Sequence, residues 1–156
     1  MASQQLVLGL GNDLLGDDGV GPWLVEALRR RPSLAGFDFE TAEGGGLGLL
    51  DLLDGYRRAF VVDCVADENG RPGQVQLLSA EEFETQSVTL SSHYAGLPQV
   101  LALGQKLGLT MPEVQVLAVS VKDPYRIGTD FSPALRRRLP AIAAELEQVL
   151  LEADHA

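Results

Sequence analysis

Apolar residues recur along this chain in two patterns, short continuous or alternating runs and longer stretches with helical spacing. The short runs predict strands at residues 4–10, 36–42, 58–65, 74–78 and 113–119. The helical spacing predicts helices at residues 22–30, 47–53, 94–107 and from 132 to the end. Pro140 lies inside the last stretch and predicts a kink or a late start of that helix, because proline cannot donate a backbone hydrogen bond.

The order of these elements predicts the fold. Strands alternate with helices except at residues 67–73, where turn-forming residues join two strands by a short connection that favours an antiparallel hairpin. Alternation with one hairpin is typical of an α/β protein, a three-layer α/β/α sandwich with a mainly parallel sheet. The length of 156 residues, without a linker or repeat, predicts a single domain over residues 1–156.

Composition narrows the classes of partner. A net charge of −10 disfavours nucleic acid, because binding a phosphate backbone depends on lysine and arginine. We expect no membrane partner and a cytoplasmic location, since no apolar run reaches the roughly 18 residues of a membrane helix and the start lacks the basic region of a signal peptide. The single cysteine, Cys64, excludes an internal disulfide, and nothing in the sequence demands more than a monomer.

Polar residues gather where the predicted strands end. In open α/β sheets, ligands bind at the carboxyl ends of the strands, so these positions are candidates for a site. They are Asn12, Asp17 and Asp18 after the first strand, Glu43 after the second, and Asp63 at the end of the third.

The segment GLGNDLLGDDGVG, residues 9–21, begins like a dinucleotide-binding loop, but Leu14 stands where that fingerprint has its third glycine. Two adjacent carboxylates, Asp17 and Asp18, would repel a pyrophosphate and favour a cation instead. The alternative for Asp17, equally favoured, is a cap on the helix that follows.

A cation site would need further ligands, and Asp63 and His93 are the candidates. An acid at the end of the most apolar strand is costly unless it is paired or bound to metal. His93 is the candidate imidazole, because His155, the other histidine, lies next to the C-terminus. Asp18, Asp63 and His93 together make a set that nickel, zinc or manganese accepts with coordination positions left open. Each of the three alone also has an ordinary structural interpretation.

Two other features allow a structural or a functional interpretation. Cys64 follows Asp63 and is interpreted as a small buried hydrophobic residue rather than as a nucleophile. The glycines Gly44, Gly45 and Gly46 form either a flexible turn or a loop that lets another backbone approach closely.

Four motifs in this order resemble those of the nickel-iron hydrogenase maturation endopeptidases, over nearly the whole chain. They are GLGNDLLGDDGVG (9–21), EGGGLG (43–48), VVD (61–63) and SHYAGL (92–97). The resemblance implies a five-stranded mixed sheet with one antiparallel strand. It also implies a reaction, removal of a C-terminal extension from the hydrogenase large-subunit precursor after nickel insertion.

The resemblance further implies that Asp18, Asp63 and His93 are the metal-contacting and catalytic residues. In this interpretation nickel is carried by the substrate, and other divalent ions may occupy the same site. Glu43 with the three glycines, Gly44, Gly45 and Gly46, would bind the precursor tail, although the family typically has an aspartate where this chain has Glu43.

Two alternatives remain at this stage. One is a metal-binding adaptor or metallochaperone in hydrogenase assembly that uses the same ligands without cutting. The other is a small-substrate hydrolase of related architecture, similar to the peptidyl-transfer-RNA hydrolases, although the acidic charge disfavours a nucleic-acid substrate.

Overall fold

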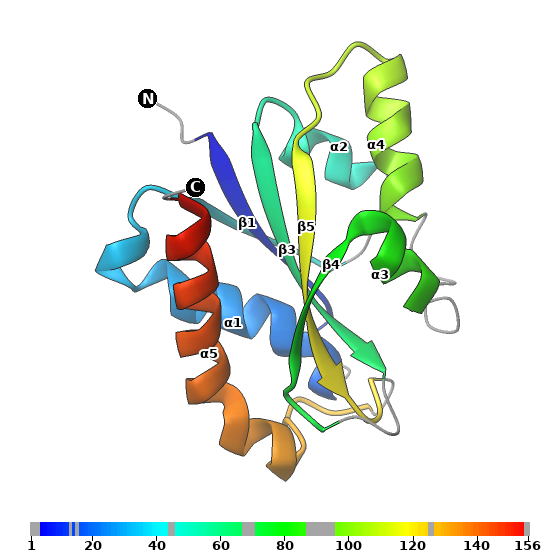
Figure 1. The fold of residues 1–156 in the computed structure, drawn as a ribbon. Helices are drawn as coiled ribbons and strands as arrows, with labels where there is room; N and C mark the ends of the chain where they lie inside the picture. Colours follow the sequence, from blue (N-terminus) through cyan, green and yellow to red (C-terminus); the bar gives the residue numbers. More distant parts are fainter. Residues whose placement is uncertain are drawn as a thin grey trace.

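A five-stranded sheet forms the centre of the protein (Figure 1). The computed structural model describes residues 4–12, 14, 16–43, 46–66, 71–86, 96–124 and 127–154. The strands are β1 (Gln5–Leu10), β2 (Asp38–Ala42), β3 (Arg58–Ala66), β4 (Val75–Ser79) and β5 (Glu113–Val121). Their order across the sheet is β2-β1-β3-β5-β4, and β4 alone runs antiparallel to its neighbour. The predicted mixed sheet is confirmed.

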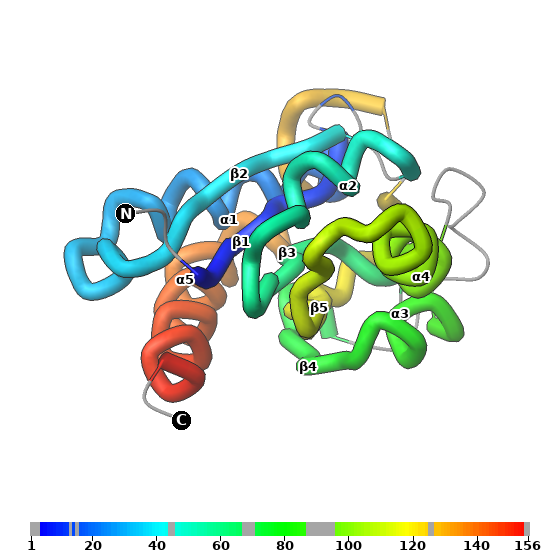
Figure 2. The backbone as a smooth tube through the Cα atoms, turned by 90° about the horizontal axis from the view of Figure 1, so that it is seen from above, coloured from blue at the N-terminus to red at the C-terminus, as the bar shows by residue number. Residues whose placement is uncertain are grey.

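Helices cover both faces of this sheet, which confirms the three-layer prediction (Figure 2). One layer holds α1 (Val20–Arg29) and α5 (Pro133–Asp154). The other holds α2 (Gly48–Leu53), α3 (Ala80–Gln86) and α4 (Leu97–Lys106). None of the helices in the described ranges is long and apolar enough to cross a membrane.

The central strand β3 supplies both hydrophobic cores, because successive side chains of a strand point to opposite faces. Phe60 and Val62 pack into the core under α1 and α5, whereas Val61 and Val65 pack into the core under α2 and α4. A strand with apolar residues on both faces needs a helical layer on each face of the sheet, and β3 has both while it lies between β1 and β5.

The predicted hairpin has the right direction but the wrong partner. Strand β4 follows β3 in the sequence, yet it pairs with β5, with Leu78 opposite Val116. The reason is burial: the last six residues of β5 are buried, whereas Leu77 on β4 is 48% exposed, so β5 suits the interior and β4 the edge.

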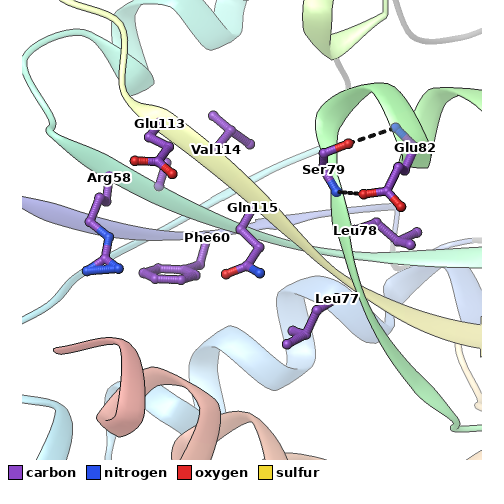
Figure 3. Close-up of a pocket in the computed structure, with 10 residues that line it drawn as sticks. Arg58, Phe60, Leu77, Leu78, Ser79, Glu82, Glu113, Val114 and Gln115 are labelled. Carbon is purple, nitrogen blue, oxygen red and sulfur yellow. Dashed lines mark hydrogen bonds between the residues drawn. The ribbon is translucent and has the colours of Figure 1, made fainter. Parts of the chain in front are cut away.

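Helix α3 is absent from the prediction, although its start carries a recognisable signal. Ser79 accepts a hydrogen bond from the Glu82 backbone N–H at 3.0 Å, and the Glu82 side chain accepts one from the Ser79 N–H at 3.0 Å (Figure 3). This reciprocal pair is the capping box of a Ser-x-x-Glu sequence. The Ser-x-x-Glu sequence is therefore a local signal for the start of this helix.

The last helix begins next to its predicted first residue. Helix α5 runs from Pro133 through Pro140, which lies on its exposed side, so of the two expectations for Pro140, a kink or a late start, the late start is wrong. Leu135, Leu139 and Ile142 on the opposite side are buried against the sheet. Packing of this apolar stripe stabilises the helix despite the backbone hydrogen bond that proline cannot make.

Two glycines bring α1 directly onto the sheet. A Cβ atom on Gly21 would collide with the carbonyl oxygens of Leu10 and Val62, and one on Gly9 would lie 2.7 Å from the Gly21 carbonyl oxygen. These distances from a hypothetical Cβ atom are shorter than the contacts that side chains make in folded proteins. The glycines of the first motif therefore have a packing role, and they define where the loop between β1 and α1 can run.

Candidate metal centre

The site begins where β1 ends and β3 continues. Gly9 pairs with Val62 at the end of the β1–β3 ladder, but the β3–β5 ladder runs on to Ala66 opposite Val121. The expectation that Asp63 terminates its strand is therefore wrong, because pairing with β5 continues the strand beyond it. Asp63 instead lies where the neighbouring strand β1 stops, so one side of β3 is open to another segment.

Asp18 fills part of this opening from the 3₁₀ turn Gly16–Gly19, which joins the β1 loop to α1. Its Oδ2 atom accepts a hydrogen bond from the Asn12 backbone N–H at 2.8 Å. Its Oδ1 atom accepts one from the Cys64 Sγ at 3.3 Å. These two contacts hold the carboxylate between the end of β1 and the continuing part of β3.

Asp63 is 3% exposed, which is unusual for a carboxylate. Its Oδ1 atom accepts the N–H of Cys64 at 2.8 Å. Within the described part of the chain, no residue donates a hydrogen bond to Oδ2. Burial raises the pKa of Asp63 well above its usual range; the Cys64 N–H opposes the shift and the charge of Asp18 adds to it.

The two carboxylates and the thiol form one cluster. A ligand atom from each of Asp18, Asp63 and Cys64 lies within 4.8 Å of the others. Bonds from zinc to oxygen or sulfur are about 2.0–2.3 Å, so ligands of one ion lie at most about 4.6 Å apart. Only a small adjustment of side chains would bring all three atoms onto one ion. The donors present therefore fit a divalent cation.

The neutral thiol is the favoured form of Cys64 without a cation. Burial raises the pKa of this thiol well above its usual range, and the nearby charges of Asp63 and Asp18 act in the same direction. Cys64 is 5% exposed and belongs to the core under α1 and α5. The expected burial is thus confirmed, but the polar contact with Asp18 is an addition to the hydrophobic interpretation.

The neighbouring acid, Asp17, has a different task. Its two carboxylate oxygens accept hydrogen bonds from the backbone N–H and the hydroxyl of Ser132, both at 2.7 Å. Helix α1 begins after Gly19 without a side-chain cap, so the capping alternative for Asp17 is wrong. Ser132 directly precedes α5, and Asp17 therefore joins the β1 loop to the start of the last helix.

The remaining predicted site residues are only partly described. His93, Gly44 and Gly45 lie outside the described residues. Glu43 is exposed and follows β2, whose last residue, Ala42, pairs with Leu10 at the end of β1. Gly46 has a φ of +82°, which favours glycine, and a Cβ atom there would meet no other atom within 4 Å.

Two of the hollows lined by described residues lie at opposite ends of the sheet. One of about 420 Å³ borders Asp17 and Ser132 at the carboxyl edge, with Lys122 and Arg137 in its wall. The other, of about 300 Å³, surrounds Phe60 near the amino ends of β3 and β5 (Figure 3). The hollow at the carboxyl edge is therefore the one closer in the chain to the cluster, because Asp17 in its wall directly precedes Asp18.

The comparison with protein families decides which group this fold and cluster belong to. The family model described as HycI: Hydrogenase maturation protease matches residues 22–149. The chain belongs to the hydrogenase maturation protease family. The matched range includes Asp63 and begins just after Asp18.

Individual relatives of the family agree. The chain is 31% identical to a hydrogenase expression/formation protein, HupD, of Thiocapsa roseopersicina over 91% of its length, and 34% identical to the hydrogenase 2 maturation protease of Escherichia coli over 62%. These alignments span 66% and 60% of the two relatives' own lengths, slightly less than two thirds.

A solved structure supports the same fold. The hydrogenase maturating endopeptidase HybD from Escherichia coli superposes with a TM-score of 0.76 at 25% identity, covering 98% of this chain and 94% of that one. The mixed sheet between two helical layers is therefore shared with a structurally characterised member of the family.

Proposed function

We propose that this protein is the endopeptidase that removes the C-terminal extension of a nickel-iron hydrogenase large-subunit precursor after nickel insertion. Membership of the hydrogenase maturation protease family supports the reaction class. The observation that carries the proposal is the convergence of Asp18 and Asp63 at the carboxyl edge of the sheet, where a cation fits between them.

In this proposal the nickel ion is part of the substrate, and the protease recognises it. The carboxylates of Asp18 and Asp63 supply hard oxygen ligands, and His93 supplies an imidazole. A precursor without nickel offers these side chains nothing to bind, so cleavage follows metal insertion. The burial of Asp63 supports this role, because a cation offsets the cost of burying a carboxylate.

Nickel held by these residues would supply Lewis-acid chemistry toward the scissile carbonyl or a bound water. Asp63 is the group in the described part of the cluster that we assign to proton uptake, because its Oδ2 accepts no hydrogen bond from the described residues. Asp18 has hydrogen bonds to both oxygens, so its task is to bind and orient.

The precursor tail would approach along the same edge. Gly44, Gly45 and Gly46, together with Glu43, follow β2, and the space around Gly46 leaves room for an extended chain. The hollow beside Asp17 provides further room next to the cluster. The tail therefore reaches the metal-binding side chains without displacing a helix.

The deciding experiment uses the purified protein with a large-subunit precursor, either loaded with nickel or free of it. Gel electrophoresis should show shortening of the loaded precursor alone. Replacing Asp18, Asp63 or His93 by alanine should reduce the rate at least about 100-fold, as loss of a group that touches the reacting atoms does.

Asp17→Asn is the matched control, because it changes the adjacent acid and keeps an acceptor for Ser132. This variant should cleave within a few-fold of the parent rate. Cleavage of the nickel-free precursor at the same rate would contradict nickel recognition. Binding of the loaded precursor without cleavage would instead identify a metal-binding adaptor.

A further inference from the structure

The open side of β3 places Cys64 where it can reach the same ion as the two carboxylates. Consecutive strand residues normally point to opposite faces of a sheet, which would separate Asp63 from Cys64. Here β1 stops at Leu10, and Asp18 lies beside the continuing part of β3. From this position Asp18 is within reach of both neighbours, and its Oδ1 lies 3.3 Å from the Cys64 sulfur.

A second observation points to a ligand at this place. Asp63 is only 3% exposed, and its Oδ2 receives no hydrogen bond from the described residues. One ligand atom each from Asp18, Asp63 and Cys64 lies within 4.8 Å of the other two. A carboxylate group this buried is costly in its charged form unless a donor or a cation compensates it. The cluster therefore combines the spacing of a metal site with a buried acid that a cation would stabilise.

We propose that Cys64 is a further protein ligand of this ion, beside Asp18 and Asp63, and makes the site selective for thiophilic divalent metals such as Ni²⁺, Zn²⁺ or Co²⁺ over Mn²⁺ and Mg²⁺. Carboxylates and imidazole alone accept Mn²⁺ readily, whereas a thiolate favours softer ions. Ligation breaks the S–H bond, forms a sulfur–metal bond and releases the proton to solvent. This inference rests on the proposed function, which supplies the metal ion, and it adds a reason why the site would prefer nickel over harder ions.

The test needs the metal alone and no precursor. Co²⁺ added to the purified full-length protein should produce a thiolate-to-cobalt charge-transfer band in the near ultraviolet. Cys64→Ser, which keeps a similar shape but does not form a thiolate, should lose this band. Asp17→Asn should keep it, because Asp17 contacts Ser132 and not the cluster.

Affinities provide the second measurement. Removing partners outside the ligand shell costs about 10–100-fold in metal affinity, so loss of a direct ligand should weaken Ni²⁺ binding by at least about tenfold. Mn²⁺ affinity, followed by electron paramagnetic resonance, should change much less. Calorimetry in buffers of different ionisation enthalpy should show about one proton fewer released per Ni²⁺ in Cys64→Ser.

Each other result overturns the inference. Cobalt binding without the band would mean that the thiol only donates a hydrogen bond to Asp18, and absence of cobalt binding would remove the metal site of the free protein. Equal loss of Ni²⁺ and Mn²⁺ affinity in Cys64→Ser would indicate a packing effect, which Cys64→Ala and thermal unfolding would check. Precursor cleavage is measured separately, so a protease without the band keeps its proposed function and loses only this ligand.

Discussion

Tyr56 shows how a single side chain braces the end of the sheet away from the metal centre. Its hydroxyl donates a 2.6 Å hydrogen bond to the Asp38 carboxylate at the start of β2, while Tyr56 itself lies just before β3. Partial burial raises the pKa of Tyr56 to about 12, and the hydrogen bond and charges of Asp38 and Glu40 add to the shift. The brace therefore requires the neutral phenol.

Tyr56→Phe should lower the free energy of unfolding by about 1 kcal/mol at neutral pH, the usual net value of one hydrogen bond. The pKa is higher in the folded than in the unfolded state, so this stabilisation is complete below about pH 10 and is lost as the pH rises toward about 12. Urea unfolding at several pH values should show the difference from the parent protein narrowing over that range.

Asp38→Asn is the control for this residue, because it keeps an acceptor and removes the charge. Its pH dependence between about 10 and 12 should be weaker than that of the parent, since the carboxylate is one cause of the raised tyrosine pKa. A constant difference between the parent and Tyr56→Phe at all pH values would contradict the assignment.

At the scale of elements, the contact between β1 and α1 sets the course of the loop that carries Asp18. Gly21 lies against the backbone of Leu10 and Val62, leaving no room for a side chain. Gly21→Ala should therefore lower the free energy of unfolding by about 3 kcal/mol, as overpacking against backbone does. It should do so even though alanine favours a helix over glycine by about 1 kcal/mol.

The matched control is Gly48→Ala at the first residue of α2, where a new Cβ would meet no atom within 4 Å. This variant should keep the parent stability or gain up to about 1 kcal/mol. Urea denaturation of both proteins compares the two outcomes. Equal effects at the two positions would mean that α1 does not lie so close to the sheet.

At the scale of the whole molecule, one sheet is shared by two cores and should make them unfold together. Leu53, the last residue of α2, is fully buried against one face of the sheet, whereas Trp23, the single tryptophan, lies on α1 in edge contact with Phe131 on the other side. Leu53→Ala should cost about 3 kcal/mol through the cavity it leaves. The loss should appear equally in tryptophan fluorescence and in far-ultraviolet circular dichroism.

Leu47→Ala provides the comparison, because Leu47 is 67% exposed next to the same helix and should change stability little. A fluorescence transition that stays at the parent position while circular dichroism shifts would show that the two cores unfold independently.

Features of the fold that depend on neighbouring residues in the chain could be predicted from the sequence, whereas features that depend on distant segments could not. Helical and strand periodicities are local, and they correctly indicated α1, β1 and the buried stripe of α5. The partner of β4 depends on whether β5 or β4 buries more apolar surface, a comparison between segments far apart in the chain. The position of Asp63 within its strand likewise depends on pairing with β5.

For the candidate site, the sequence by itself determined that Asp18 comes after one apolar run and Asp63 at the end of another, which is enough to bring both to one edge of a parallel sheet. Only the tertiary structure decided that Cys64 joins them and that Asp17 turns away to Ser132. The physical reason is register: β1 ends earlier than β3, and the space that this leaves is a property of two paired strands. The pattern of apolar residues within one strand does not indicate where the neighbouring strand ends.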